Sequence, residues 1–342
     1  MKVAVFSTKF YDQELLDLAN ANRHQIVYYS QGLDSTTLGW AKNCDALCLS
    51  ISDKVDANMI VKLSDIGINL LVLRSAGFDN IDIAAAEKSK MAVMRVPSYS
   101  PESIAEHAAA LVLSLARKIH KAFNRVRDNN FSLDNLLGFT LSGKTVGVIG
   151  TGKIGRAFCR IMLGFGCKVI AHDIKKSEWV INHGIDYVSL DELLTSSDII
   201  SLHCPLNDGT RHLFAKQNFD KCKRGFMLIN TSRGGLIKTT DAAEALKSGQ
   251  VGNLGIDVYE GESGLFFKDL SGTVVVDDLI ERLMSFSNVL ITPHQAFFTR
   301  EAIEQIAIST IQNISNFEDG TSTENQVSST NIQSTKPLNE TR

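Results

Sequence analysis

Residues 145–173 read TVGVIGTGKIGRAFCRIMLGFGCKVIAHD. An apolar run at 145–149 leads directly into Gly150, Gly152 and Gly155, and an amphipathic segment follows. The spacing G-x-G-x-x-G between a strand and a helix is typical of a dinucleotide-binding βαβ unit. The first glycine permits a tight turn, the second lets the backbone approach a pyrophosphate, and the third allows the helix to pack on the strand. The stretch therefore predicts a Rossmann-type domain.

Asp173 ends the next apolar run, 18 residues after the last glycine of the motif. A carboxylate at this position accepts both ribose hydroxyls of adenosine, and its charge repels the additional phosphate of NADP. NAD is therefore the expected cofactor. Lys175 and Lys176 could partly neutralise a phosphate, but we expect them in a solvated loop. The residues expected to line the pyrophosphate within the turn are Lys153 and Ile154.

Apolar and amphipathic segments alternate on both sides of this motif, which is typical of βαβ units and parallel sheets. The 342 residues exceed the usual size of a single core, so we expect two doubly wound parallel-sheet α/β domains. Residues 100–123 predict one long helix that bridges the domains, and residues 299–320 predict a terminal helix. Residues 320–342 are polar with almost nothing to bury, and we expect them to be disordered.

Composition excludes several classes of partner. The net charge of -3, without a long Lys/Arg cluster, offers no basic field for nucleic acid or for anionic lipid. The six cysteines lack the paired spacings of a zinc site or of a small disulfide framework, so we expect no metal and reduced thiols. No window approaches 18 uninterrupted apolar residues, and the first residues carry no long apolar run. A cytoplasmic protein without a membrane partner is expected.

Three polar residues follow apolar runs of the second half of the chain: Arg233, Glu262 and His294. Parallel strands present their carboxyl ends to one crevice, so these side chains are candidates for one site. An arginine holds a carboxylate with two hydrogen bonds, a histidine exchanges a proton, and a glutamate orients and charges that histidine. Taken singly, Arg233 also fits a surface ion pair, Glu262 a solvated loop acid and His294 a satisfied structural residue. His203, at another strand end, is the rival histidine.

The motifs RSAGFDNID, AEHAAALVLSLAR, GVIGTGKIGRA, DIISLHCPL, LINTSRGGLI, GIDVYEGE and ITPHQAF occur in order along the chain. These motifs make the sequence similar to the D-isomer-specific 2-hydroxyacid dehydrogenases over residues 1 to about 318. Within that family it resembles the NAD-dependent D-lactate dehydrogenases. Many members follow the catalytic glutamate with proline, whereas here SGLFFKD follows Glu262 and QAFF follows His294. Both departures are similar to the lactate branch.

The resemblance implies that Arg233, Glu262 and His294 are catalytic and that Asp257 positions the nicotinamide carboxamide. Beside the cofactor it places Cys204, Pro205, Thr231 and Ser232. Facing the substrate carboxylate it places the backbone of Ser75, Ala76 and Gly77, together with Tyr99, Arg233 and His294.

The resemblance also implies a discontinuous fold. The flavodoxin-like substrate domain would comprise residues 1–99 and 297–319, the inserted NAD-binding Rossmann domain residues 100–296, and the tail residues 320–342. The expected reaction is hydride transfer between NADH and pyruvate, giving D-lactate, in a homodimer or a homotetramer. Two alternatives remain open: a relative that reduces bulkier 2-oxo acids such as phenylpyruvate, and an NAD-sensing corepressor-like protein.

Overall fold

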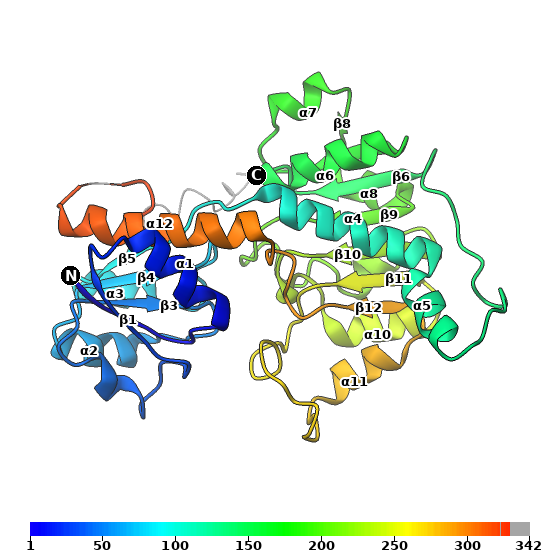
Figure 1. Cartoon of the computed structure of the whole chain (residues 1–342). Coiled ribbons are helices and arrows are strands. Elements are labelled where there is room, and N and C mark those ends of the chain that lie inside the picture. Colours follow the sequence, from blue (N-terminus) through cyan, green and yellow to red (C-terminus); the bar gives the residue numbers. More distant parts are fainter. Residues whose placement is uncertain (322, 329–342) are drawn as a thin grey trace. The chain divides into compact units, whose positions relative to one another are not determined.

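The computed structural model describes residues 1–321 and 323–328 (Figure 1). The chain divides into two compact units, which are taken in turn below. One unit contains Met1–Ser100 and the described residues from Phe297 onward, and the other is Pro101–Ala296. The chain thus leaves the first unit once and returns to it after the second.

The first unit is a five-stranded parallel sheet in the order β2-β1-β3-β4-β5. One face packs on α2 and α3, and the other packs on α1 and α12. Figure 1 shows α12 beside α1, although almost the whole sequence separates them. Its elements are β1 (Lys2–Val5), α1 (Phe10–Asn20), β2 (Gln25–Tyr28), η1 (Leu38–Ala41), β3 (Ala46–Leu49), α2 (Ala57–Asp65), β4 (Leu70–Leu73), α3 (Ile83–Lys88), β5 (Ala92–Met94) and α12 (Arg300–Glu318).

The second unit is a seven-stranded parallel sheet in the order β12-β11-β10-β9-β6-β7-β8. Helices α4 and α6 cover one face, and α8, α10 and α11 cover the other. Its elements are α4 (Pro101–Arg117), α5 (Ile119–Arg127), β6 (Thr145–Ile149), α6 (Lys153–Gly164), β7 (Lys168–His172), α7 (Glu178–Asn182), β8 (Asp186–Tyr187), α8 (Leu190–Ser196), β9 (Ile199–Leu202), α9 (Lys216–Phe219), β10 (Phe226–Asn230), η2 (Gly234–Leu236), α10 (Thr239–Lys247), β11 (Val251–Ile256), α11 (Asp278–Ser285) and β12 (Val289–Ile291).

Local sequence explains these elements. The inner strands β3, β4, β9 and β10 are buried at every residue, as expected for parallel strands covered on both faces. Several helices begin at a side chain that accepts a backbone N–H of the first turn. These N-cap residues are Asp56, Asp82, Ser189, Asp277 and Thr299. The predicted fold class of two doubly wound parallel sheets is confirmed.

The structure corrects the prediction of one helix over residues 100–123. Lys118 adopts a left-handed φ of 52°, which an α-helix cannot continue through. The segment therefore forms two helices, α4 and α5, on either side of this residue. The terminal helix is confirmed as α12.

The structure also corrects the prediction that the polar tail is disordered from residue 320 onward. The first part of the tail pairs with the edge strand β5, where Met94 bridges Gln326 in antiparallel fashion. The N–H of Val327 donates to the carbonyl of Val93 at 2.8 Å, and the Val327 side chain is buried. An open strand edge offers unpaired backbone groups, which explains how a polar segment is ordered here. The predicted disorder of residues 322 and 329–342 lies outside the described residues.

Among the described residues, no helix is both long enough and apolar enough to cross a bilayer.

Candidate active site

Strand register brings five strand ends to one edge of the second sheet. Ile149, Leu202, Asn230, Ile256 and Ile291 are the last residues of β6, β9, β10, β11 and β12, and each is paired with its neighbour in register. The polar residues that follow these strands therefore start from the same edge. Strands β6 and β9 are neighbours at the point where the strand order reverses, which is where open α/β sheets bind ligands.

The glycine motif forms the turn between β6 and α6. Gly150 has a φ of +95°, and a Cβ there would lie 2.5 Å from the backbone nitrogen of Cys204. A Cβ on Gly155 would lie 2.0 Å from the carbonyl oxygen of Gly150, so helix and turn are in direct contact. A Cβ on Gly152 would meet nothing within 4 Å, which leaves open space at the N-terminus of α6. This turn fits the approach of a pyrophosphate to backbone N–H groups.

Asp173 lies at the end of β7, next to the glycine turn. Its Oδ2 accepts hydrogen bonds from the backbone N–H and the hydroxyl of Thr151, and its Oδ1 accepts from the backbone N–H of Lys175 at 3.0 Å. The Tyr187 hydroxyl lies 2.7 Å from Thr151 Oγ1. Carboxylate oxygens accept two hydrogen bonds each, so Oδ1 retains capacity for a ribose hydroxyl. Sequence reasoning missed Tyr187, which β8 brings to this corner.

The predicted cofactor residues after β9 and β10 contact each other. The Ser232 hydroxyl donates to the carbonyl of Cys204 at 2.7 Å, and the carbonyl of Pro205 accepts from the Thr210 hydroxyl at 2.6 Å. Burial raises the pKa of the Cys204 thiol to about 12, so this thiol is neutral and is not a nucleophile near pH 7.

Thr231 provides a test of whether a cofactor fits. Its side-chain oxygen is buried, and within the described residues it has no hydrogen-bond partner. A buried hydroxyl without a partner costs free energy unless a ligand supplies one. With the open space at Gly152, this hydroxyl fits a dinucleotide whose polar groups reach the end of β10.

His294 and Glu262 are brought together by the structure. Nδ1 of His294 lies 3.2 Å from Oε1 of Glu262, and the side chains are 15% and 29% exposed. Glu262 is oriented by the backbone N–H of Tyr259, which donates to its second oxygen at 3.1 Å. The ring of Phe267 lies 5.7 Å from the imidazole, measured between centroids. Nε2 of His294 is therefore the nitrogen that remains to exchange a proton with a ligand.

Arg233 follows β10, and its loop contacts the loop that carries Glu262. Its Nη1 donates to the carbonyl of Ser232 at 2.8 Å. A Cβ on Gly234 would lie 2.1 Å from the backbone carbon of Tyr259, so only glycine permits this approach. The two loops are thus in backbone contact.

His203 is unsuited to proton exchange with a ligand. Its ring packs 5.0 Å from the ring of Phe158, and its Nε2 lies 2.9 Å from the Ser201 hydroxyl. Desolvation of the ring lowers the pKa of His203 to about 3, so the ring is neutral near pH 7. The structure therefore favours His294 over its rival.

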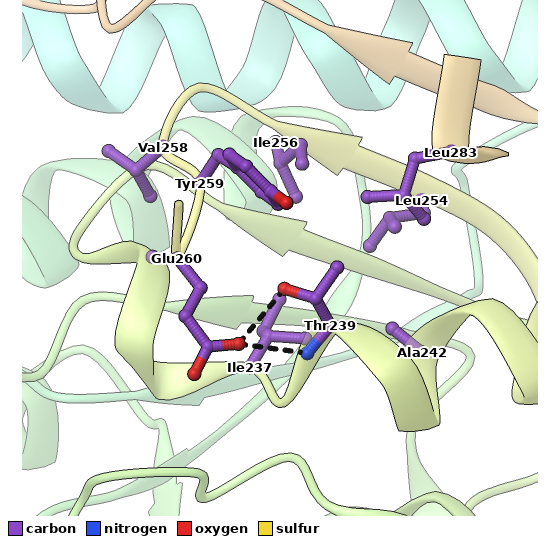
Figure 2. Close-up of a pocket in the computed structure, with 10 residues that line it drawn as sticks. Ile237, Thr239, Ala242, Leu254, Ile256, Val258, Tyr259, Glu260 and Leu283 are labelled. Atoms are coloured by element: carbon purple, nitrogen blue, oxygen red, sulfur yellow. Dashed lines mark hydrogen bonds between the residues drawn. The ribbon is translucent and has the colours of Figure 1, made fainter. Parts of the chain in front are cut away.

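A small cavity lies on the core side of the turn at residues 258–260 (Figure 2). Its volume of about 10 Å³ holds roughly one water molecule. Figure 2 shows Glu260 bonded to the backbone N–H and the hydroxyl of Thr239, at 3.2 and 3.0 Å. Arg233, Glu262 and His294 do not line this cavity, so it supports the turn and is too small for a substrate.

The predicted substrate loop of the first unit follows β4. The carbonyls of Ser75, Ala76 and Gly77 accept hydrogen bonds from Val96 N–H, from Arg95 Nη1 and from the Ser75 hydroxyl, at 3.1, 2.7 and 2.8 Å. These bonds fix the loop conformation within its own unit. A loop held in this way suits backbone N–H groups that bind an anion.

Tyr99, the remaining predicted residue of the first unit, lies in an aromatic cluster. Its ring centroid lies 6.3 Å from that of Phe297, and Phe298 packs 4.7 Å from Tyr11. Of this cluster, the sequence predicted a substrate-binding role only for Tyr99. The contact of Tyr11 with Phe298 joins the two ends of the chain.

Comparisons with known proteins agree with this geometry. Residues 109–296 match the family described as D-isomer specific 2-hydroxyacid dehydrogenase, NAD binding domain. The D-lactate dehydrogenase kk1H of Curvularia clavata is 47% identical, over 95% of this chain and 94% of that protein. The structure of the pyruvate reductase of Chlamydomonas reinhardtii superposes with a TM-score of 0.90 at 44% identity, covering 95% of this chain and 98% of that chain. The D-lactate dehydrogenase of Aquifex aeolicus in complex with NAD and lactic acid superposes with a TM-score of 0.84 at 33% identity, covering 93% and 96%.

Proposed function

Because the chain belongs to the D-isomer-specific 2-hydroxyacid dehydrogenases, we propose that it interconverts pyruvate and D-lactate. It is an NAD-dependent oxidoreductase, as its NAD-binding domain indicates. The observation that carries the proposal is the pair of His294 and Glu262 at 3.2 Å, on the sheet edge where Arg233 also starts. Relatives with D-lactate dehydrogenase activity in their names support the choice of substrate.

The proposed mechanism assigns one task to each residue. When bound, NADH would supply the hydride that reduction of the pyruvate carbonyl requires. Arg233 binds the substrate carboxylate with its guanidinium fork and polarises the neighbouring carbonyl. His294 donates a proton from Nε2 to the carbonyl oxygen, where negative charge develops. Glu262, at Nδ1 of the same ring, stabilises the imidazolium form that donates.

The cofactor and the substrate would be bound by further residues of the chain. We propose that the turn at Gly150–Gly155 binds the pyrophosphate and that Asp173 binds the adenosine ribose. The residues proposed to lie beside the nicotinamide half are Cys204, Pro205, Thr231 and Ser232. Asp257 is proposed to position the nicotinamide carboxamide. Ser75, Ala76, Gly77 and Tyr99 are proposed to contact the substrate carboxylate.

The proposed substrate is tested by a panel of 2-oxo acids. We expect kcat/KM for NADH oxidation to be higher with pyruvate than with phenylpyruvate. The measurement is the decrease in NADH absorbance with each acid over a range of concentrations. A higher kcat/KM with phenylpyruvate would contradict the proposed substrate and would indicate a dehydrogenase of bulkier 2-oxo acids.

Cofactor preference is expected to depend on the charge of Asp173. NADH should be preferred over NADPH, and Asp173→Asn should narrow this preference because the amide no longer repels a phosphate. Loss of a hydrogen bond to a charged group costs about 1.5 to 3 kcal/mol, so kcat/KM with NADH should fall roughly 10- to 150-fold. The measurement is kcat/KM with each cofactor at saturating pyruvate.

Asparagine is less disruptive than alanine because its side-chain oxygen still accepts the bonds that Thr151 donates, and only the bond from the Lys175 N–H is lost. Asp173→Ala would remove these bonds as well and would confound the two effects. Lys175→Ala, next to the same loop, is a control that should leave the preference nearly unchanged. Equal kcat/KM for NADH and NADPH in the unmodified protein would refute the role of Asp173.

We propose that the protein is a homodimer that pairs through α5 and the segment after it. Five apolar side chains in this region are each more than half exposed, an unusual concentration for a monomer surface. These residues are Ile119, Phe123, Phe131, Leu133 and Leu137. Figure 1 shows this segment extending away from the sheet of its own unit before it returns to β6.

The dimer is expected to dissociate when Phe123 and Leu137 are replaced together by Asp. Light scattering should give twice the chain mass of 37.5 kDa for the unmodified protein and the single chain mass for the variant. Leu18→Asp is the control, since Leu18 is 77% exposed on α1, outside the proposed interface. A monomeric unmodified protein would contradict the proposal, and four chain masses would indicate the homotetramer instead.

The protein is also proposed to act in the cytoplasm. All six cysteines are buried and unpaired, and thiols in this state agree with a reducing compartment.

A further inference from the structure

The buried side chain of Asp257 accepts hydrogen bonds from the loop that carries His294. This carboxylate is fully buried just after β11. Its Oδ1 accepts from the Thr292 hydroxyl and from the N–H of Gln295 at 2.9 Å, and its Oδ2 accepts from the N–H of Ala296 at 2.8 Å. Its backbone carbonyl accepts the N–H of His294 at 2.8 Å. Asp257 therefore fixes the backbone on both sides of the catalytic imidazole.

His107, on α4, contacts both Thr292 and Asp257. Its Nε2 lies 2.9 Å from Thr292 Oγ1 and 3.4 Å from Oδ1 of Asp257, and its side chain is 18% exposed. The single hydroxyl hydrogen of Thr292 is donated to Asp257, so Thr292 Oγ1 is the acceptor toward His107. His107 Nε2 must then carry a hydrogen. His107 therefore donates a hydrogen bond to Thr292, and Thr292 donates one to Asp257.

The conformation of His294 shows why such support is needed. Its φ of +55° lies in the left-handed region, which is strained for a residue with a side chain. A strained backbone of this kind persists only where surrounding contacts over-determine it. Loss of one anchor would let the backbone relax and would move the ring away from Glu262, which it faces at 3.2 Å.

We propose that His107 is a positioning residue for the reaction, because its N–H holds Thr292 and Asp257 in the arrangement that sets the imidazole of His294 against Glu262. The proposal rests on the proposed role of His294 as the proton donor. His107 acts through two intervening side chains, so its loss should lower kcat and leave the KM for pyruvate nearly unchanged.

The test compares two substitutions of His107. His107→Leu removes the N–H, whereas His107→Gln keeps an N–H at a similar reach from the backbone. A small displacement of a catalytic group costs up to about 100-fold in rate, so we expect His107→Leu to lower kcat roughly 10- to 100-fold. His107→Gln should retain most of the activity. Unchanged kcat in His107→Leu, or an equal loss in both variants, would overturn the proposal.

Thr292→Val tests whether the two residues act in series. Valine has the shape of threonine without its hydroxyl, so this variant breaks the same chain one step closer to Asp257. The double variant with His107→Leu should be no slower than Thr292→Val alone, since the second change removes nothing further. Independent, multiplicative losses would show that His107 does not act through Thr292. Melting temperatures of all variants establish that folded protein is compared.

A second readout needs no substrate. The ring C–H signal of His294 in the proton NMR spectrum, identified by its loss in His294→Gln, should move in His107→Leu and in Thr292→Val and stay in place in His107→Gln. His183→Leu is the control, because His183 stacks on Trp179 elsewhere in the same unit. An unmoved signal in His107→Leu contradicts the positioning role. Failure of the unmodified protein to reduce pyruvate would contradict the proposed function alone, and the NMR comparison would still decide this inference.

Discussion

Replacement of His294 by Gln is expected to lower kcat/KM for pyruvate reduction by about 10² to 10⁴, the range of a general acid. Glutamine can donate a hydrogen bond to the carbonyl oxygen but cannot transfer a proton to it. The loss should appear mainly in kcat, because the proton moves in the transition state. The measurement is steady-state NADH oxidation, with NADH affinity determined separately by fluorescence. Near-normal turnover in this variant would exclude His294 as the acid.

Glu262→Gln separates the orientation of His294 from its charge. The amide keeps the shape of the side chain at Nδ1 but lacks the negative charge that stabilises imidazolium. Loss of this charge removes stabilisation from the ring that donates the proton, so we expect Glu262→Gln to lower kcat for pyruvate reduction and to leave the affinity for NADH nearly unchanged. His203→Gln is the comparison, since that neutral ring should take no part in the proton transfer. An unchanged kcat in Glu262→Gln would contradict the dyad.

Replacement of Arg233 by Lys is the second large effect that we expect. The guanidinium binds a carboxylate with two parallel bonds, which the single point charge of lysine does not reproduce. Loss of one charge-assisted bond costs about 1.5 to 3 kcal/mol, which corresponds to a roughly 10- to 150-fold lower kcat/KM. We expect a higher KM for pyruvate together with a lower kcat. The measurement is the initial rate as a function of pyruvate concentration at saturating NADH.

Arg224→Lys provides the matched control for this substitution. Arg224 lies in the same unit, and its guanidinium donates to the carbonyl of Ser248 at 2.8 Å in an exposed position. Its replacement should leave both kinetic constants unchanged. Kinetics of Arg233→Lys that match those of Arg224→Lys would remove Arg233 from the substrate site.

The sequence was sufficient for features that short-range patterns encode. The glycine spacing predicted the turn of Gly150 and Gly155, because each glycine meets a steric demand within a few residues. Apolar runs predicted the buried strands, and the residue after each run predicted which side chains start at the sheet edge. The meeting of Glu262 and His294 followed from strand ends that a parallel sheet aligns.

The sequence was insufficient where partners are distant along the chain. His107 precedes Thr292 by 185 residues, and no local pattern indicates that α4 delivers its ring to the end of β12. The ordering of Val327 depends on the open edge of β5, which becomes visible only after the strand order is known. The helix break at Lys118 was missed because an apolar stripe continues across it. Each of these features depends on a tertiary contact or on a backbone conformation, which the helix and strand propensities of the residues do not indicate.

The product that the unmodified protein forms from pyruvate and NADH decides whether the proposed function is right. Chiral chromatography of the completed reaction, with NADH consumption measured in parallel, gives both the stereochemistry and the stoichiometry. We predict D-lactate alone, with one NADH consumed for each molecule formed. Formation of L-lactate, or no consumption of NADH with pyruvate, would contradict the assignment of this chain as a D-lactate dehydrogenase.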